Sequence, residues 1–289
     1  MSDDGAQALT VIAFVGSVFS PYYAWARRRG VAQALNHSAF NIALYGRRGG
    51  RWAMTERGAA QVDRGPSLLS IGPSTMDFSG DTLSIAINEV CAPLPRRVRG
   101  AIRLYPKALC GQSFALDPAG LHRWAPLAPC ARIEVRMSDP DLEWSGTGYM
   151  DSNFGDAPLE ESFEDWTWSR ASLPDRTAVL YDFKARESAP QSLALQFDAQ
   201  GGVREMETPP PASLPATRWR LPRQTRADEG QEVRVVRTLE DGPFYSRTQL
   251  ETRLFGVRAP AVHESLSLDR FRSGWVQCLL PFRMPRVAR

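Results

Sequence analysis

The sequence lacks the features that mark most membrane-spanning, metal-dependent and nucleotide-dependent proteins. No run of about 18 apolar residues occurs, so no transmembrane helix is predicted. No charged segment followed by an apolar one predicts a signal peptide. Only three histidines are present, too few for a histidine-rich metal site. Walker A, HExxH and GxSxG sequences are absent, as is GxGxxG between a strand and a helix. We therefore expect neither a cofactor nor a metal ion.

Net charge and cysteine content are low as well. The formal net charge of the 289 residues is +3, which gives no support to nucleic-acid binding. The four cysteines are not spaced as metal ligands, and in so long a chain they do not indicate a disulfide framework. Arginines nevertheless cluster at 27–29, 47–48 and 96–99, and in the tail at Arg283, Arg286 and Arg289. Such clusters are either solvated surface or contacts to an anionic membrane. We expect a cytoplasmic protein that is at most peripherally attached to a membrane.

Short alternating segments separated by turn residues are typical of β-strands and dominate the chain. With 22 Gly and 22 Pro, few windows can hold a long helix, and only residues 22–35, interrupted by Gly30, favour one. We expect strands at 38–45, 51–56, 82–90, 97–105, 131–137, 142–150, 163–171, 178–184, 192–198, 216–220, 232–239, 244–254 and 262–268.

Turn residues join several of these segments as hairpins. Three such joins are 138–141, 173–176 and 198–202. About a dozen short strands with tight turns predict an all-β protein with little helix, built from two β-barrel or sandwich domains packed together. We place the boundary so that the domains are residues 1–157 and 158–289. The Pro-rich stretch 208–215 is a second candidate boundary, which we interpret as a loop inside the second domain.

Two short pairs are the best candidates for a reactive site. Residues i and i+2 of a strand project from the same face, so His122 points the same way as Trp124, and Tyr149 the same way as Asp151. A hairpin at 131–150 brings the second pair towards the first. Inside a barrel, an imidazole, an indole, a phenol and a carboxylate then meet in an apolar cavity.

The same four residues also fit a purely structural interpretation. Inward-facing Trp and Tyr side chains in a β-barrel commonly belong to the core, because each buries a large apolar area. His122 fits a hydrogen-bonded core histidine, and Asp151 fits a turn residue at a strand end. Four side chains with polar atoms that converge in a core all need hydrogen-bond partners, and this requirement favours a functional site. The pattern leaves both interpretations open.

Several long strings of the chain resemble the bacterial carotenoid 1,2-hydratases, also called hydroxyneurosporene synthases. These strings are FSPYYAWA at 19–26, RWAMTERG at 51–58, APLPRRVRG at 92–100, GYMDSNFGD at 148–156 and ESLSLDRF at 264–271. The resemblance extends over nearly the whole chain. It implies two lipocalin-like domains, in agreement with the two-barrel prediction.

The resemblance also implies an activity: a hydro-lyase that adds water to the terminal C1–C2 double bond of acyclic carotenoids such as neurosporene and lycopene, without organic cofactor or metal. The family's functional His-x-Trp and Tyr-x-Asp pairs fall on His122 and Trp124 and on Tyr149 and Asp151. The resemblance further implies other enzymes of carotenoid biosynthesis as partners.

The chemistry of hydration suits these residue types. Protonation of the alkene at C2 needs a carboxylic acid kept neutral by burial, for which Asp151 is the candidate, and leaves a tertiary cation at C1. The Trp124 indole face is a candidate to stabilise that cation, with Tyr149 assisting or orienting Asp151. His122 is expected to position and deprotonate water or to hold the Asp151 proton, and the acid and base roles of these two residues stay interchangeable.

Two other function classes stay open. The first is a non-catalytic carrier of a polyene or terpenoid, because lipocalin-like pockets often only bind. The second is a terpenoid isomerase or cyclase that uses the same acid without capturing water. The preferred carotenoid, hydration at one or both ends, and the oligomeric state are not readable from the sequence.

Overall fold

The structure is a computed structural model that describes residues 1–46 and 50–287. Arg47, Arg48 and Arg289 of the predicted basic clusters lie outside the described residues. Within the described part, strands form sheets of eight, seven, five and two members, and helices are few and short. The all-β prediction is confirmed. None of the described helices is long and apolar enough to cross a membrane.

The chain divides into two compact units, each assembled from several segments. The first comprises residues 1–106, 131–149 and 277–289, and the second comprises residues 107–130 and 150–276. The chain passes from one unit to the other within two long strands, β11 (His122–Asp139) and β12 (Asp141–Gly155). The predicted division into domains of residues 1–157 and 158–289 stays a prediction.

The first unit holds the five-stranded sheet and most of the eight-stranded sheet. The five-stranded sheet has the order β1-β2-β4-β22, with β3 also on β2, and the eight-stranded sheet has the order β10-β11-β9-β8-β7-β6-β5, with β12 on β11. The elements first named here are β1 (Ala8–Val15), α1 (Pro21–Arg28), η1 (Ala34–His37), β2 (Ser38–Tyr45), β3 (Arg51–Met54), β4 (Glu56–Arg57), η2 (Ala59–Gln61), β5 (Val62–Arg64), β6 (Leu68–Ile71), β7 (Ser74–Ser79), β8 (Thr82–Val90), β9 (Arg97–Pro106), η3 (Leu280–Phe282) and β22 (Arg286–Val287).

Local signals explain why helix α1 is shorter than the predicted 22–35. Ser20 caps it, because its hydroxyl accepts a hydrogen bond from the Tyr23 N–H at 3.1 Å, and Pro21 suits the first turn. Gly30 then adopts a φ of 69°, which ends the helix. The signal that interrupted the pattern in the sequence is therefore the one that stops the helix.

A buried polar cluster fixes the C-terminal segment within the first unit. Strand β22 pairs in parallel with β4, and the Arg286 guanidinium donates to the Glu56 carboxylate. His37 lies 2.9 Å from the same carboxylate oxygen, measured from Nδ1 to Oε1. Glu56 is fully buried, so this ion pair compensates for a charge that would otherwise be costly to bury.

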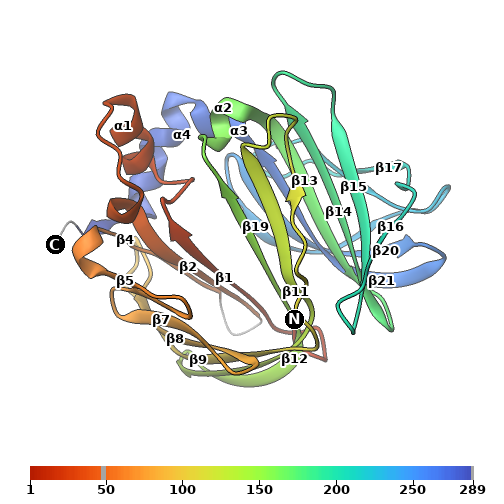
Figure 1. Ribbon diagram of the computed structural model, residues 1–289, viewed down its shortest axis with the longest axis horizontal. Coiled ribbons are helices and arrows are strands. Elements are labelled where there is room, and N and C mark those ends of the chain that lie inside the picture. The colour runs from red at the N-terminus through yellow and green to blue at the C-terminus, as the bar shows by residue number, and fades with distance from the viewer. Residues whose placement is uncertain (47–49, 288–289) are drawn as a thin grey trace. The chain divides into compact units, whose positions relative to one another are not determined.

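The second unit is organised around the seven-stranded sheet, in the order β16-β15-β14-β13-β21-β20-β19. Figure 1 shows β13 to β15 in green to teal and β20 and β21 in blue. Its elements are β10 (Phe114–Ala115), α2 (Leu159–Ser162), β13 (Phe163–Ser172), β14 (Arg176–Ala185), β15 (Gln191–Asp198), β16 (Val203–Glu205), β17 (Pro211–Leu214), β18 (Arg223–Arg226), β19 (Arg234–Asp241), β20 (Tyr245–Leu254), β21 (Val257–Ser267), α3 (Leu268–Arg272) and α4 (Gly274–Leu279), whose last residues belong to the first unit.

The two faces of this sheet carry different side chains. Tyr181 is aligned with Trp168, which is aligned with Glu264, so these three side chains share one face. His263 precedes Glu264 on the same strand and therefore points to the opposite face. That opposite face holds the apolar cluster to which Leu214 of β17 contributes.

Most predicted strands are present, and one is wrong. Predicted strands 38–45 and 82–90 coincide with β2 and β8, and the turns at 138–141, 173–176 and 198–202 each join two strands. Residues 216–220 are not a strand, because the chain turns there and Arg220 has a φ of 55°. The Pro-rich stretch 208–215 contains β17 and lies inside the second unit.

Candidate active site

The structure joins Trp124 directly to Asp151. The indole Nε1–H of Trp124 donates to Oδ2 of Asp151 at 2.8 Å. Trp124 lies on β11 and is fully buried, whereas Asp151 lies on β12 and is half-buried. An indole N–H can only donate, so this contact assigns an acceptor role to one carboxyl oxygen. From the sequence, the two residues are expected to approach each other only because of a predicted hairpin. The structure shows a direct hydrogen bond between them.

Aromatic rings surround the Trp124 indole. The centroid of Phe114, its partner on β10, lies 5.6 Å away, and that of Tyr181 lies 5.7 Å away with an interplanar angle of 88°. Phe197 adds an edge contact at 6.4 Å. Such edge-to-face packing is favourable and directional. It fixes the indole so that its nitrogen addresses Asp151.

His122 is buried next to Trp124 but bonds elsewhere. Its Nε2 lies 2.8 Å from the Ser162 hydroxyl, and its backbone N–H donates to Asp117 at 2.7 Å. Burial lowers the pKa of the His122 imidazole, while the charges of Asp117 and Asp156 act in the opposite direction. The imidazole is therefore neutral at neutral pH.

Gly155, at the end of β12, permits the chain to pass close to His122. A Cβ placed on Gly155 would lie 2.6 Å from Nδ1 of the imidazole and 2.6 Å from the Leu121 carbonyl oxygen. Real side chains do not approach so closely, so glycine is required here. The GYMDSNFGD string thus supplies both Asp151 and the glycine that makes room for His122.

Tyr149 occupies β12 two residues before Asp151. It is half-buried and is the last residue of that segment of the first unit, whereas Met150 begins the second. Because the strand is continuous here, the Tyr149 and Asp151 side chains leave it on the same side. The assignment of Tyr149 and the other three residues to a catalytic site stays a proposal.

Two residues that the sequence did not single out also belong to this environment. Ser162 bonds His122, and Tyr181 packs on Trp124. Burial, followed by the charge of Asp151, raises the pKa of the Tyr181 phenol well above its usual range. Ser162 ends helix α2, and Tyr181 lies in the middle of strand β14, so neither residue stands in a recognisable sequence motif.

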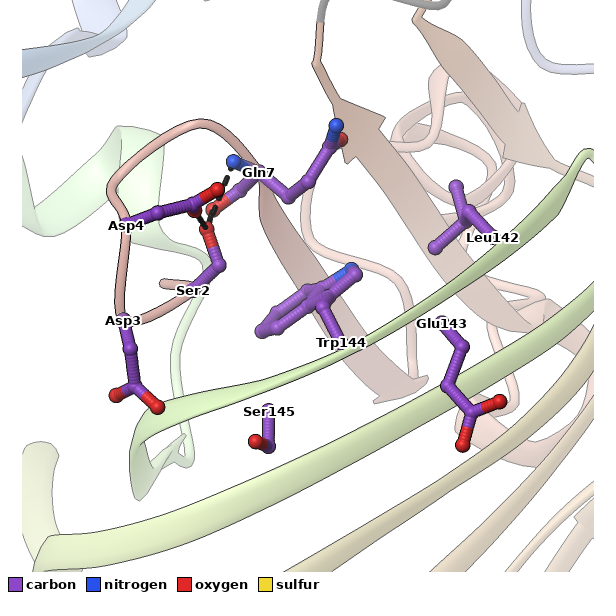
Figure 2. A pocket seen from close by; sticks show the side chains of 8 residues that line it. All are labelled: Ser2, Asp3, Asp4, Gln7, Leu142, Glu143, Trp144 and Ser145. Atoms are coloured by element: carbon purple, nitrogen blue, oxygen red, sulfur yellow. Dashed lines mark hydrogen bonds between the residues drawn. The ribbon is translucent and has the colours of Figure 1, made fainter.

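A separate surface hollow of about 450 Å³ lies in the first unit and contains none of the four predicted residues. Figure 2 shows its lining side chains, among them Trp144 and the Ser2 hydroxyl, which donates to Asp4 at 2.6 Å. The hollow is open to solvent, and its lining includes the carboxylates of Asp3, Asp4 and Glu143, so it does not suit a polyene. No group of His, Cys, Asp or Glu residues in the described part is arranged to hold a metal ion.

Comparison with known proteins decides the family. The family described as carotenoid hydratase CrtC matches residues 11–289. This chain belongs to the carotenoid hydratase family. It is 55% identical to the acyclic carotenoid 1,2-hydratase of Thiocapsa roseopersicina, over 99% of this chain and 71% of that relative. The hydratase of Rubrivivax gelatinosus is 46% identical over 100% of this chain and 72% of its own length. That of Cereibacter sphaeroides is 42% identical over 96% and 98%.

Two solved structures resemble this chain in fold. An AttH protein of Nitrosomonas europaea has a TM-score of 0.61 and 13% identity, covering 92% of this chain and 88% of that one. The crystal structure of CghA with Sch210972 has a TM-score of 0.59 and 13% identity, covering 92% and 86%. At sequence identities this low, the similarity concerns the fold alone. The structural similarity confirms the prediction of a lipocalin-like all-β fold.

Proposed function

We propose that this chain is an acyclic carotenoid 1,2-hydratase, which adds water to the terminal C1–C2 double bond of neurosporene, lycopene or a related polyene. Family membership over residues 11–289 supports the reaction class. The observation that carries the proposal to particular atoms is the hydrogen bond from Trp124 to Asp151 at 2.8 Å.

Asp151 is the proposed acid. When its carboxyl is protonated, the indole N–H of Trp124 is best accepted by the carbonyl-type oxygen, here Oδ2, so the acidic proton sits on Oδ1. Transfer of this proton to C2 forms the new C–H bond and leaves a tertiary cation at C1 and a carboxylate on Asp151. The retained N–H bond then stabilises that carboxylate, and charge-assisted bonds are roughly twice as strong as neutral ones.

This geometry changes the role we assign to Trp124. The predicted cation–π contact needs an indole face turned to the substrate, but Trp124 is fully buried among Phe114, Tyr181 and Phe197. We propose that Trp124 orients the acid. The half-buried Tyr149, on the same side of β12 as Asp151, is then the aromatic group proposed to face the cation.

His122 is the proposed base for water. A neutral imidazole accepts a proton from water as the oxygen bonds to C1, and the product alcohol and a protonated His122 result. The proton then returns to the Asp151 carboxylate, which closes the cycle without an external oxidant or reductant. Burial keeps the His122 imidazole unprotonated before the reaction, and Ser162 holds its Nε2 side.

The remaining features of the proposal concern the surroundings of the enzyme. Because the cycle moves only protons and water, we propose that it uses neither an organic cofactor nor a metal. The substrate is a water-insoluble polyene, so we propose peripheral attachment to the cytoplasmic face of the membrane. Other enzymes of carotenoid biosynthesis are proposed as the source and destination of the polyene.

Expression in a host that makes lycopene as its sole carotenoid tests the proposal, with the 1-hydroxy product as the readout. Asp151→Asn should lower turnover by about 10²- to 10⁴-fold, because the amide cannot supply the proton. Trp124→Phe keeps a ring but removes the N–H donor, and should lower turnover by a smaller factor. Asp141→Asn, at the exposed start of the same strand, is the matched control.

A carrier would give a different result. It would retain lycopene with and without Asp151 and form no hydroxylated product. Soluble wild-type protein that yields no product heavier by one water would refute the proposed reaction, and an unchanged rate in Asp151→Asn would refute the assignment of the acid.

A further inference from the structure

Two tryptophans of the second unit form a stacked pair on the surface. The ring centroids of Trp219 and Trp275 are 5.9 Å apart, and their planes differ by 22°. The two residues are 42% and 51% exposed, unusually high for such large apolar side chains. Trp219 lies in the turn between β17 and β18, and Trp275 lies in α4. The hydration chemistry proposed above does not use either of them.

The turn that carries Trp219 is held in a costly backbone conformation. Arg220 has a φ of 55°, in the left-handed region that side chains other than glycine avoid. The Arg270 guanidinium donates to the Trp219 carbonyl oxygen at 2.6 Å and to the Arg220 carbonyl oxygen at 2.8 Å. The Arg218 N–H donates to the Asp241 carboxylate at 2.8 Å. These hydrogen bonds hold the backbone of the turn in place, so the position of Trp219 on the surface is fixed.

Positive charge accompanies the exposed rings. Arg218 and Arg220 flank Trp219 and are exposed, and the exposed Arg272 precedes Trp275 by three residues. Two carboxylates also belong to these surroundings: Asp241, at the end of β19, and Asp269, in α3 with Arg272. Asp241 is engaged by the Arg218 backbone, and Asp269 is neutralised by Arg186 at 2.6 Å. Three exposed arginines thus stand within three residues of the paired tryptophans in the sequence, and of the two carboxylates Asp269 is paired with Arg186 while Asp241 accepts the Arg218 backbone N–H.

We propose that Trp219 and Trp275, with Arg218, Arg220 and Arg272, form an anchor that docks the protein on an anionic lipid bilayer. Tryptophan favours the level of lipid headgroups, where one side of the ring is apolar and the other is wet. Arginine next to it is attracted to the negative surface potential of such a membrane. The inference rests on the proposed peripheral attachment, but not on the proposed chemistry.

Cosedimentation of the full chain with carotenoid-free vesicles tests the anchor. Vesicles of phosphatidylcholine with about one third phosphatidylglycerol should bind the protein, and binding should weaken as salt is raised. Pure phosphatidylcholine should bind it far less. Trp219→Ala with Trp275→Ala should weaken binding to anionic vesicles by on the order of tenfold, through the loss of apolar area.

A second variant tests the charges and leaves the tryptophans in place. Arg218→Ser, Arg220→Gly and Arg272→Ser together should weaken binding on the order of 100-fold, about fivefold for each arginine. Glycine suits the left-handed position of residue 220, so the turn is kept. The charge-matched control is Arg97→Ser, Arg99→Ser and Arg103→Ser, on exposed positions of β9.

The outcomes separate cleanly. Hydration of lycopene dispersed in detergent should be unchanged in the anchor variants, while hydration of lycopene in anionic vesicles should fall with binding. An equal loss of binding in the β9 control would show that net charge acts without a specific surface, and would overturn the anchor. Wild-type protein that ignores anionic vesicles would overturn it too, whether or not the enzyme hydrates lycopene.

Discussion

Two buried histidines of the second unit make an instructive comparison. His122 is 3% exposed and His263 is 1% exposed, and each places Nε2 near a serine hydroxyl, at 2.8 Å from Ser162 and 3.0 Å from Ser265. Trp124, two residues from His122, packs on the Tyr181 face of the seven-stranded sheet, whereas His263 points to the other face. Both side chains are enclosed by protein and bond a serine, but His263 lies deeper in the protein than His122.

The charges around them are not equivalent. Burial lowers the pKa of both imidazoles, but near His122 the carboxylates of Asp117 and Asp156 offset part of that effect. Near His263 the Arg223 guanidinium adds to it, and the pKa of His263 falls to about 3. A base must be neutral before the reaction and able to accept a proton during it. Deep burial, to which the arginine adds, makes protonation of His263 unfavourable, whereas the carboxylates near His122 favour its protonation.

The largest contrast should appear when each histidine is replaced by glutamine. Gln preserves a polar atom near the serine but cannot accept a proton. His122→Gln should lower turnover of lycopene by about 10²- to 10⁴-fold, the usual range for loss of a general base. His263→Gln should leave turnover within about threefold. Product formation by purified, folded protein measures both.

Equal losses in the two variants would show that packing, not proton transfer, explains the effect of His122→Gln. Melting temperatures of both variants are the control, because each replaces a buried ring and similar destabilisation is expected.

The sequence alone predicts the side-chain direction at this site but not the contacts. The i, i+2 spacing of His122 and Trp124 indicates a common face, and the two residues contact neighbouring parts of one aromatic cluster, at Phe163 and Tyr181. The hydrogen bond from Trp124 to Asp151 depends on the register of β11 and β12, which alternation does not fix.

Other partners were out of reach for a different reason. Ser162 meets His122 across 40 residues of sequence, and its local surroundings give no sign of that contact. Long-range pairing also explains the error at 216–220. The alternation of apolar and polar residues in that segment predicts a strand. In the structure, Arg270, some 50 residues further along the chain, donates to the carbonyl oxygens of Trp219 and Arg220 and holds them in a turn.

A smaller effect is expected from Gly155→Ala. The added methyl would meet Nδ1 of His122 at 2.6 Å, so either the imidazole or the end of β12 must move. A shift of this size at a reacting group should lower turnover by about tenfold or more, since misplacement by 1 Å can cost about 100-fold. Gly111→Ala is the matched control, because a Cβ there meets nothing within 4 Å. Unchanged turnover in Gly155→Ala would argue against a catalytic position for His122.

The smallest effect concerns stability, and it isolates His263. Its pKa of about 3 lies below the ordinary 6.5, so between those values the unfolded chain binds a proton that the folded chain does not. The contribution of His263 to stability is therefore fully present above about pH 6.5 and is lost as the pH falls towards 3, with a slope that approaches about 1.4 kcal/mol per pH unit between these values. His263→Gln should flatten this slope in thermal unfolding measured from pH 7 to pH 5. His122→Gln should flatten it less, because the pKa of the less deeply buried His122 is lowered less and the nearby carboxylates oppose the shift. If the two variants flattened the slope equally, the charges of Arg223, Asp117 and Asp156 would not distinguish the histidines, and the comparison would fail.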